Sequence, residues 1–403
     1  MIWTFKKSMY RIQQRTMKTV SRVIPFPVPM LLSGAGSVEN LAENIKVRCL
    51  KNVLVVTDKV LMDLKLPESL LESLHEHGIK FTIFDDVQPN PTIENVEKGR
   101  ALYQKNNCDS IIGFGGGSAI DCAKIIGARV SNPLIPVRWM KGLFRVILPI
   151  PPFFCVPTTA GTGSETTVAA VISDPSTHEK FAINDLKLIP KIAVLDPELM
   201  VGLPPHITST TGMDALTHAV EAYIGLNGSK FTDENAKNAT KLIFENLEKA
   251  YKNGSDLDAR TNMALASFYA GSAFTRAYVG YVHAIAHNLG GLYGVPHGLA
   301  NAVILPYVLE FCRKEAENKL ADLAIAGRIG TRKETAEDLS VKFIEKIKSL
   351  NKNMKIPTYI KELQEKDIPL IARRALAEAH PDYPVPRIMT LDECETIVAK
   401  LLP

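Results

Sequence analysis

Between about residues 30 and 200, short runs of β-branched and aromatic residues alternate with stretches of helical periodicity. The runs NVLVVTD (52–58) and KFTIFDDV (80–87) are separated by the amphipathic segment VLMDLKLPESLLESLHEHG (60–78). A strand, a crossover helix and a second strand in this order typically build a parallel sheet. The sequence therefore predicts a doubly wound α/β domain with a Rossmann-like sheet. Further strands are expected at FFCVPTT (153–159) and KIAVLDP (191–197).

The character of the sequence changes after GLPPHIT (202–208), where helical periodicity dominates and strand patterns almost vanish. Pro204 and Pro205 mark a new start, because a proline ring disfavours helix at the residue before it. We therefore predict two domains, an α/β dinucleotide-binding domain over residues 1–205 and an all-α domain over residues 206–403.

The first 38 residues carry six basic side chains and no acidic one, so the rest of the chain has a net charge of −2 within the total of +4. Such a body has no electrostatic footprint for nucleic acid. The basic stretch itself has two open interpretations, an organelle transit peptide or an N-terminal extension over residues 1–30. The chain length of 403 residues provides for two sizeable hydrophobic cores.

No apolar run reaches the length of about 18 residues that a membrane-spanning helix needs. The most apolar stretch, GLFRVILPIPPFFCVP (142–157), contains Arg145 and four prolines. The six cysteines stand singly, without a CxxC pair, which speaks against a disulfide framework and a thiolate metal site. We expect a cytoplasmic protein with neither a membrane nor a nucleic acid as partner.

A glycine turn follows the buried run at residues 110–114 and leads directly into a helix, in the order IIGFGGGSAIDCAKIIG. Gly116, Gly117 and Ser118 would let the backbone approach a ligand closely, and the free N–H groups of a helix start favour a pyrophosphate. The spacing is not the Rossmann fingerprint. A second loop rich in glycine and hydroxyl groups, PTTAGTGSETT (157–167), also follows a strand, so the two loops are expected to flank one cofactor.

Asp58 ends the first of the clear strands. A carboxylate at this place can accept hydrogen bonds from both ribose hydroxyls of an adenosine and repels a 2′-phosphate, which favours NAD over NADP. An aspartate that caps the following helix is an equally good explanation of the spacing.

The second domain contains a group of side chains that commonly bind metal ions. Asp214 and His218 lie four residues apart in TGMDALTHAVEAY and therefore on one helix face. His283, His287 and His297 follow in a segment of small and apolar residues. One carboxylate with several imidazoles and no thiolate is a ligand mix for Fe(II), Zn(II) or Mn(II). Spacing alone favours His283 and His287 as the paired ligands.

Taken together, the chain resembles the iron-containing (group III) alcohol dehydrogenases, which share a fold with dehydroquinate synthase and glycerol dehydrogenase. The resemblance extends from about residue 30 to the C-terminus, through GGGSAIDCAK, PTTAGTGSE, DPELMVGLPP, TGMDALTHAVEAY and GYVHAIAHNLGGLYGVPHG. It implies an N-terminal α/β domain, a C-terminal helical domain, and a homodimer or larger assembly. The implied reaction is the reversible oxidation of a primary alcohol to an aldehyde by NAD.

The resemblance also implies residue roles. The metal, Fe(II) or alternatively Zn(II), would be bound by Asp214, His218, His283 and His297. His287 would lie beside the metal without binding it and would transfer a proton or contact the nicotinamide. The cofactor would be contacted by Asp58, Asn90, Gly116, Gly117, Ser118, Thr158, Thr159, Thr162, Thr167, Lys180 and Leu199. This set replaces the ligand pair that spacing alone favours.

Two departures from the family are visible. The N-terminal stretch is longer than the family's usual start by about 30 residues. Ala169 occupies a position where several relatives have a larger side chain over the substrate, which predicts activity on alcohols longer than ethanol. Two alternative activities stay open, a lyase of the dehydroquinate synthase kind and a glycerol or diol dehydrogenase.

Overall fold

The computed structural model describes residues 2–177 and 179–403. The chain forms two compact units. One unit is an α/β body that comprises Phe26–Leu203 and Ser255–Ala264, and the other is a helical body that comprises the stretch up to Pro25, Pro204–Gly254 and Leu265–Pro403. Within the described residues, no helix is long and apolar enough to cross a membrane.

The α/β unit is built on a six-stranded sheet with the strand order β1-β9-β6-β4-β2-β3, in which all neighbouring strands are parallel. Its strands are β1 (Met30–Ser33), β2 (Asn52–Val56), β3 (Lys80–Phe84), β4 (Ser110–Gly115), β6 (Phe153–Pro157) and β9 (Ile192–Leu195). The expected strands at 52–58, 80–87, 153–159 and 191–197 are therefore present.

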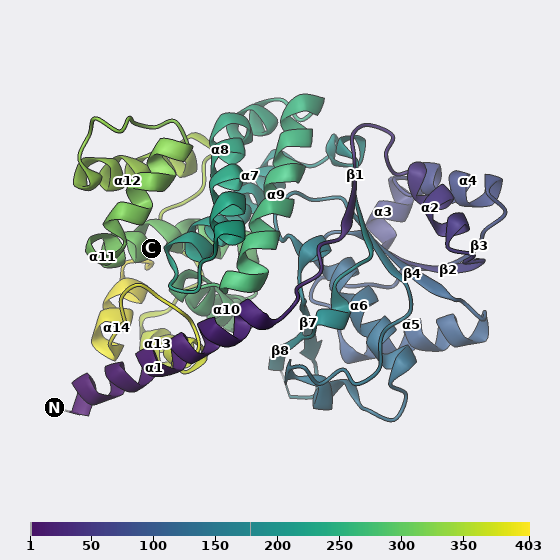
Figure 1. Ribbon diagram of the computed structural model, residues 1–403, viewed down its shortest axis with the longest axis horizontal. Coiled ribbons are helices and arrows are strands. Elements are labelled where there is room, and N and C mark those ends of the chain that lie inside the picture. The colour runs from purple at the N-terminus through teal and green to yellow at the C-terminus, as the bar shows by residue number, and fades with distance from the viewer. Residues whose placement is uncertain (1, 178) are drawn as a thin grey trace. The chain divides into compact units, whose positions relative to one another are not determined.

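Helices cover both faces of this sheet (Figure 1), and they are α2 (Asn40–Val47), α3 (Lys59–Asp63), α4 (Glu68–Glu76), α5 (Ile93–Lys105) and α6 (Gly117–Ser131). Alternate residues of β2 belong to different cores. Leu54 and Val56 pack with side chains of α5 and α6, whereas Val53 and Val55 pack with side chains of α2 and α4. Burial on both faces explains why this strand reads as a continuous apolar run.

A second, three-stranded sheet has the order β5-β8-β7. Its strands are β5 (Gly142–Leu143), β7 (Ala169–Asp174) and β8 (Glu179–Asn184), and β7 pairs antiparallel with β8. The sequence patterns did not predict this sheet. Residues of β7 alternate between partly buried and buried environments, so the strand lacks the continuous apolar run that reveals the strands of the large sheet.

The helical unit contains α1 (Ile2–Val23), α7 (Pro205–Ile224), α8 (Lys230–Lys252), α10 (Tyr281–Tyr293), α11 (His297–Ala326), α12 (Ala336–Asn353), α13 (Ile368–Ala379) and α14 (Leu391–Ala399). The helix α9 (Leu257–Ala277) begins in residues that group with the α/β unit. Short 3-10 helices lie at Val137–Met140, Ser164–Thr166, Leu186–Leu188, Pro197–Met200 and Glu365–Asp367.

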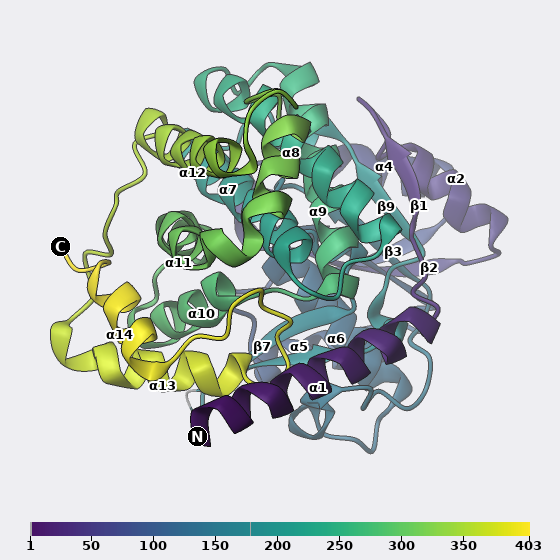
Figure 2. The same cartoon turned by 60° about the vertical axis from the view of Figure 1, so that its left-hand side comes forward.

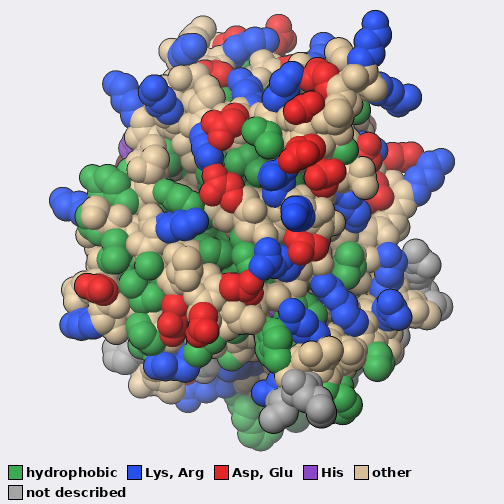
Figure 3. All heavy atoms as spheres, turned by 90° about the vertical axis from the view of Figure 1, so that its left-hand side faces the viewer, with side chains coloured by type: hydrophobic (Ala, Val, Ile, Leu, Met, Phe, Trp, Pro, Cys, Tyr) green, Lys and Arg blue, Asp and Glu red, His purple; other side chains and the backbone are tan. Residues whose placement is uncertain are grey.

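Figure 3 shows one face of the molecule. Acidic and basic side chains are interspersed over much of this face.

The division between the two units falls at Pro204, close to the predicted boundary, but two stretches differ from the prediction. Residues 255–264 belong to the α/β unit, and the N-terminal stretch belongs to the helical unit. Helix α1 runs beside the segment that follows α13 (Figure 2). It docks through polar side chains: the Arg11 guanidinium donates to the carbonyl oxygens of Val385 (2.6 Å) and Pro386 (2.7 Å).

His380 lies in this interface between α1 and the C-terminal segment. Its ring lies 5.0 Å from the ring of Tyr10, between centroids, and its Nε2 is 2.6 Å from the hydroxyl oxygen of Tyr281. Burial lowers the pKa of His380 to about 4, and the nearby Arg11 cation acts in the same direction. The imidazole is therefore neutral in the folded protein under conditions in which an exposed histidine is partly charged.

This burial predicts an acid-sensitive interface. The unfolded chain protonates the imidazole near pH 6.5, whereas the folded protein does so only near pH 4. The stabilising contribution is therefore complete above pH 6.5 and is lost as the pH falls toward 4. In His380→Gln we expect the decrease in Tm between pH 7 and pH 5 to be smaller by about 2 to 4 °C. His75→Gln, at an exposed position, is the control, and an equal decrease in both variants would contradict the prediction.

Candidate metal centre

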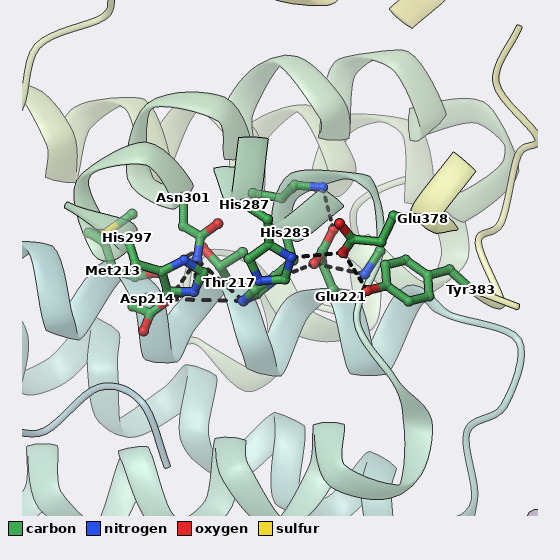
Figure 4. A network of polar contacts seen from close by, with 12 residues as sticks. Met213, Asp214, Thr217, Glu221, His283, His287, His297, Asn301, Glu378 and Tyr383 are labelled. Atoms are coloured by element: carbon green, nitrogen blue, oxygen red, sulfur yellow. Dashed lines mark hydrogen bonds and ion pairs between the residues drawn. The ribbon is translucent and has the colours of Figure 1, made fainter. Parts of the chain in front are cut away.

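Three helices carry the five candidate side chains, and Figure 4 shows four of them together, namely Asp214, His283, His287 and His297. Asp214 and His218 lie one turn apart on α7, and His283 and His287 lie one turn apart on α10. The chain then turns sharply, because Gly294 ends α10 in the left-handed conformation with a φ of 69°. This turn, completed by Pro296 as the residue that precedes α11, places His297 at the start of that helix.

Four of these side chains form one ligand set. Asp214, His218, His283 and His297 each offer one ligand atom, and all four atoms lie within 4.8 Å of one another. The first three residues are buried and His297 is partly exposed. His287 does not belong to the set, so the geometry groups His283 with His297, as the family resemblance implies and contrary to the pairing that spacing alone favours.

The surroundings of Asn301 test whether these residues suit a cation. The Asn301 side-chain nitrogen lies 2.6 Å from Asp214 Oδ1, 3.2 Å from His283 Nε2 and 3.1 Å from His297 Nε2. An amide group has two hydrogens, so it cannot serve three acceptors fully. Burial raises the pKa of Asp214 to about 7 and lowers the pKa of His283 well below its usual value. A divalent cation would satisfy these converging acceptors, and the residues therefore fit a metal ion.

A second carboxylate, Glu221, lies behind His283 and was missed by the sequence analysis. Its side chain lies 2.6 Å from His283 Nδ1 and accepts hydrogen bonds from the backbone N–H groups of Gly280 (2.9 Å) and Val282 (2.8 Å). A carboxylate on Nδ1 directs Nε2 of the same ring toward the ligand set. The signal was present in the sequence, because Glu221 follows Asp214 by seven residues and therefore lies on the same face of α7.

His287 lies next to the ligand set but has different partners. Its ring is stacked on that of His297 with 5.4 Å between centroids, and its Nδ1 lies 2.7 Å from Glu378 Oε1. The same carboxylate oxygen accepts a hydrogen bond of 2.7 Å from the Tyr383 hydroxyl. Glu378 and Tyr383 were not singled out in the sequence, because they lie about 90 residues beyond His287 without a recognisable pattern.

In the α/β unit, the two predicted cofactor loops lie side by side. Strands β4 and β6 are parallel neighbours with Gly115 opposite Pro157, so their loops leave the same edge of the sheet. Gly115 has a φ of 143°, and the side chain of Thr162 approaches Gly117 so closely that an added Cβ would lie 2.9 Å from its Cγ2. The glycine turn and the hydroxyl-rich loop therefore form one surface at the start of α6.

The other predicted cofactor residues have varied environments. Asp58 caps α3, since its Oδ1 accepts from the Leu61 N–H at 3.0 Å. This is the capping role that the spacing left open. Lys180 Nζ donates to Asn90 Oδ1 at 2.8 Å, which brings these two residues together. The remaining residues of the set were Gly116, Ser118, Thr158, Thr159, Thr167 and Leu199.

Gly116 precedes α6 and Ser118 lies in its first turn. Thr159 borders the same turn, 3.7 Å from a Cβ placed on Gly116. Thr158 donates its backbone N–H to the carbonyl oxygen of Gly115 at 3.0 Å.

Two predicted residues are less accessible. Thr167 is buried, and its hydroxyl accepts a hydrogen bond of 3.0 Å from the buried Lys124 ammonium. Leu199 is also buried and packs in the core that contains α2 and α4.

Two protein-family models match this chain. The model for "Iron-containing alcohol dehydrogenase" matches residues 29–197, and the model for the C-terminal part of the "Fe-containing alcohol dehydrogenase family" matches residues 208–402. The chain belongs to the iron-containing alcohol dehydrogenase family. The predicted fold class and the predicted enzyme class, an oxidoreductase of the alcohol dehydrogenase type, are thereby confirmed.

Relatives of this family cover most of the chain. Alcohol dehydrogenase 4 of Schizosaccharomyces pombe is 40% identical over 91% of this chain and 86% of its own length. The 1,3-propanediol dehydrogenase of Klebsiella pneumoniae is 40% identical over 89% of this chain and 94% of its own. A crystal structure of a 1,3-propanediol oxidoreductase matches with a TM-score of 0.90 and 38% identity, over 94% of this chain and 100% of that one.

The close approach of Thr162 to Gly117 predicts a sensitive position. In Gly117→Ala the added methyl group would force the two loops apart, and we expect the Kd for NADH to rise by at least about tenfold. Titration of NADH fluorescence measures this change. Gly202→Ala is the matched control, because no atom lies within 4 Å of a Cβ at that glycine. Equal affinities of the two variants would show that the loops do not form the dinucleotide site.

Proposed function

We propose that this chain is a metal-dependent, NAD-linked alcohol dehydrogenase that reversibly oxidises a primary alcohol to an aldehyde. The observation that carries the proposal is the convergence of the ligand atoms of Asp214, His218, His283 and His297 within 4.8 Å. A bound divalent metal would supply Lewis acid chemistry toward the alcohol or aldehyde oxygen. NAD would accept the hydride, and the cofactor is supported by a relative named NAD-dependent methanol dehydrogenase in Bacillus methanolicus.

The metal that we propose is Fe(II), with Zn(II) as the alternative. Four protein ligands complete a tetrahedral zinc site, whereas Fe(II) accepts further ligands and leaves room for substrate. One feature of the chain itself would support either ion, because Glu221 orients the His283 ring through Nδ1.

The proton of the alcohol hydroxyl requires an acceptor that is separate from the hydride acceptor. We assign this role to His287, whose ring is exposed and stacked on His297. Its Nδ1 is occupied by Glu378, so Nε2 is the atom that exchanges the proton. In alcohol oxidation the hydroxyl proton would pass to His287 Nε2 while bound NAD would supply the hydride acceptor, and in aldehyde reduction His287 would return the proton.

For the cofactor we propose that the pyrophosphate lies at the start of α6. The contacting residues would be Asp58, Asn90, Gly116, Gly117, Ser118, Thr158, Thr159, Thr162, Thr167, Lys180 and Leu199. Asp58 supports NAD over NADP, because a carboxylate repels a 2′-phosphate. We further propose a homodimer in the cytoplasm with a small alcohol or aldehyde as the only substrate besides the cofactor.

A diol is the second candidate substrate, since two relatives are named 1,3-propanediol dehydrogenase. A lyase of the dehydroquinate synthase kind is the remaining alternative. It would use NAD without net production of NADH. Absorbance at 340 nm with a panel of straight-chain alcohols and diols distinguishes these activities, and the absence of alcohol-dependent NADH formation after anaerobic loading with Fe(II) or Zn(II) would refute the proposed function.

Loss of a ligand should remove the metal without unfolding the protein. In Asp214→Ala and His297→Ala we expect elemental analysis to find little bound metal and kcat to fall at least about 100-fold. Circular dichroism should show unchanged helix content. His75→Ala, at an exposed position of α4, serves as the control. Full activity of metal-stripped His297→Ala would contradict the ligand assignment.

Ala169 predicts the substrate range. It begins β7, and its carbonyl oxygen accepts a hydrogen bond of 2.7 Å from Lys124 Nζ, so its backbone position is fixed. In the family that this chain resembles, the side chain at this position lies over the substrate, so a small one would leave room for a longer alkyl group, and we expect kcat/KM to rise from ethanol through butanol. In Ala169→Phe this preference should reverse. A steady decrease of the wild-type kcat/KM from ethanol to hexanol would refute the prediction.

A further inference from the structure

One oxygen atom of Glu378 links the proposed proton acceptor to the C-terminal segment. Glu378 Oε1 lies 2.7 Å from His287 Nδ1 and accepts a hydrogen bond of 2.7 Å from the Tyr383 hydroxyl (Figure 4). The His287 and Glu378 side chains are 40% and 32% exposed. A partly exposed contact of this kind between an imidazole and a carboxylate is weakly held by its own interaction, so its geometry depends on what fixes the carboxylate.

We propose that Glu378 is a positioning residue for His287, and that helix α1 keeps Glu378 in place through residues 380–387. This inference rests on the proposed function. It assigns a role in the reaction to an N-terminal helix that contributes no metal ligand.

Glu378 acts on the imidazole of His287 through the Nδ1 atom. A carboxylate that accepts from Nδ1–H fixes the tautomer in which Nε2 carries the free electron pair, and it also fixes the orientation of the ring. Although burial acts to raise the pKa of Glu378, the hydrogen bond from His287 leaves it below its usual value. Glu378 is therefore ionised at neutral pH and remains an acceptor.

Tyr383 in turn fixes the Glu378 carboxylate. The Tyr383 hydroxyl donates to the same oxygen that His287 contacts, and burial raises the pKa of Tyr383 well above its usual value. This hydroxyl therefore stays protonated and acts as a donor. It holds Oε1 in one position as long as the Tyr383 backbone is itself fixed.

Helix α1 fixes the backbone around Tyr383. Gln14 is 2% exposed, and its side-chain nitrogen donates to the carbonyl oxygens of Tyr383 (2.7 Å) and Pro381 (3.2 Å). Arg11 binds the carbonyl oxygens of Val385 and Pro386 and also donates to Gln14 Oε1 at 2.8 Å. These hydrogen bonds satisfy backbone carbonyl groups on both sides of Tyr383. Without α1, the same carbonyl groups would be exposed to water.

A second connection reaches the start of α10. The Tyr10 ring packs on His380, and His380 Nε2 lies 2.6 Å from the Tyr281 hydroxyl. That hydroxyl accepts from the Met389 backbone N–H at 2.9 Å. Because Tyr281 is the first residue of α10, which carries His287, α1 is linked through His380 to the helix of His287 and through Tyr383 to Glu378.

The experiment begins with Glu378→Gln and Tyr383→Phe. We expect kcat for alcohol oxidation to fall by about 10- to 100-fold in Glu378→Gln and less in Tyr383→Phe, with KM and metal content nearly unchanged. The solvent isotope effect on kcat should increase, because proton transfer becomes slower than hydride transfer. A purely structural role would lower Tm and metal content without changing the isotope effect, and that result would overturn the proposal.

The role of α1 is tested with a matched pair on the same helix. Gln14→Ala removes the bonds to the 381–383 backbone, whereas Gln13→Ala removes only an exposed bond of 2.7 Å to the Asp382 side chain. We expect Gln14→Ala to lower kcat about threefold, Gln13→Ala to have no effect, and the effect of Gln14→Ala to vanish in the Glu378→Gln background. Equal and additive losses in both backgrounds would show that α1 does not act through Glu378.

A measurement independent of turnover uses the zinc-loaded protein labelled with ¹⁵N-histidine. The spectrum of wild-type protein should contain a His287 signal of the Nδ1–H tautomer, which is assigned by its loss in His287→Ala. In Glu378→Gln and Gln14→Ala this signal should broaden or shift toward a mixture of tautomers. An unchanged His287 signal in both variants would overturn the positioning role of Glu378 and α1, even if the enzyme oxidises alcohols. If the wild-type protein does not oxidise alcohols, only the proposed function is refuted.

Discussion

The constraint on which the helical unit depends is the burial of a carboxylate among imidazoles. Asp214 and His283 are each 2% exposed, and an isolated buried charge is costly unless it is compensated. Asn301 provides only partial compensation, because one amide serves three acceptors. The arrangement of α7, α10 and α11 around this point therefore makes chemical sense as a preformed site for a divalent cation, with Glu221 already orienting one ligand.

Much of this organisation could be predicted from the sequence because it depends on local patterns. Apolar runs revealed the strands of the parallel sheet except β1, and a spacing of four residues brought Asp214 and His218 together on α7. The same spacing on α10 paired His283 with His287, which the ligand set does not include. The hydrogen-bond partners Asn301, Glu378 and Tyr383 could not be predicted, because tertiary packing alone decides which of many polar side chains reaches a site. For Asp58 the sequence allowed two roles, a contact with the adenosine ribose and a cap of α3. Among the described residues, Asp58 accepts a hydrogen bond from the Leu61 N–H and so caps α3.

In the α/β unit, the loops that follow β4 and β6 approach each other closely. Parallel pairing of β4 with β6 brings both loops to one edge of the sheet, and a glycine at position 117 permits Thr162 to approach. Lys124, buried in α6, donates to the carbonyl oxygens of Thr167 (2.9 Å) and Ala169 (2.7 Å). The ammonium group thus ties the end of the second loop to the helix that begins at the first, so a single helix determines the positions of both loops.

Helix α1 has a consequence for the order in which the chain can fold during synthesis. The bond from Gln14 to the Tyr383 carbonyl joins positions 369 residues apart, whereas residues 26–203 form most of the α/β unit as one continuous stretch. A ribosome releases the chain from its N-terminus, so the α/β unit can become compact while α1 still lacks its partners. Helix α1 precedes the α/β unit in the sequence but is therefore docked after it, and the helical unit is complete only when α1 has reached residues 381–386.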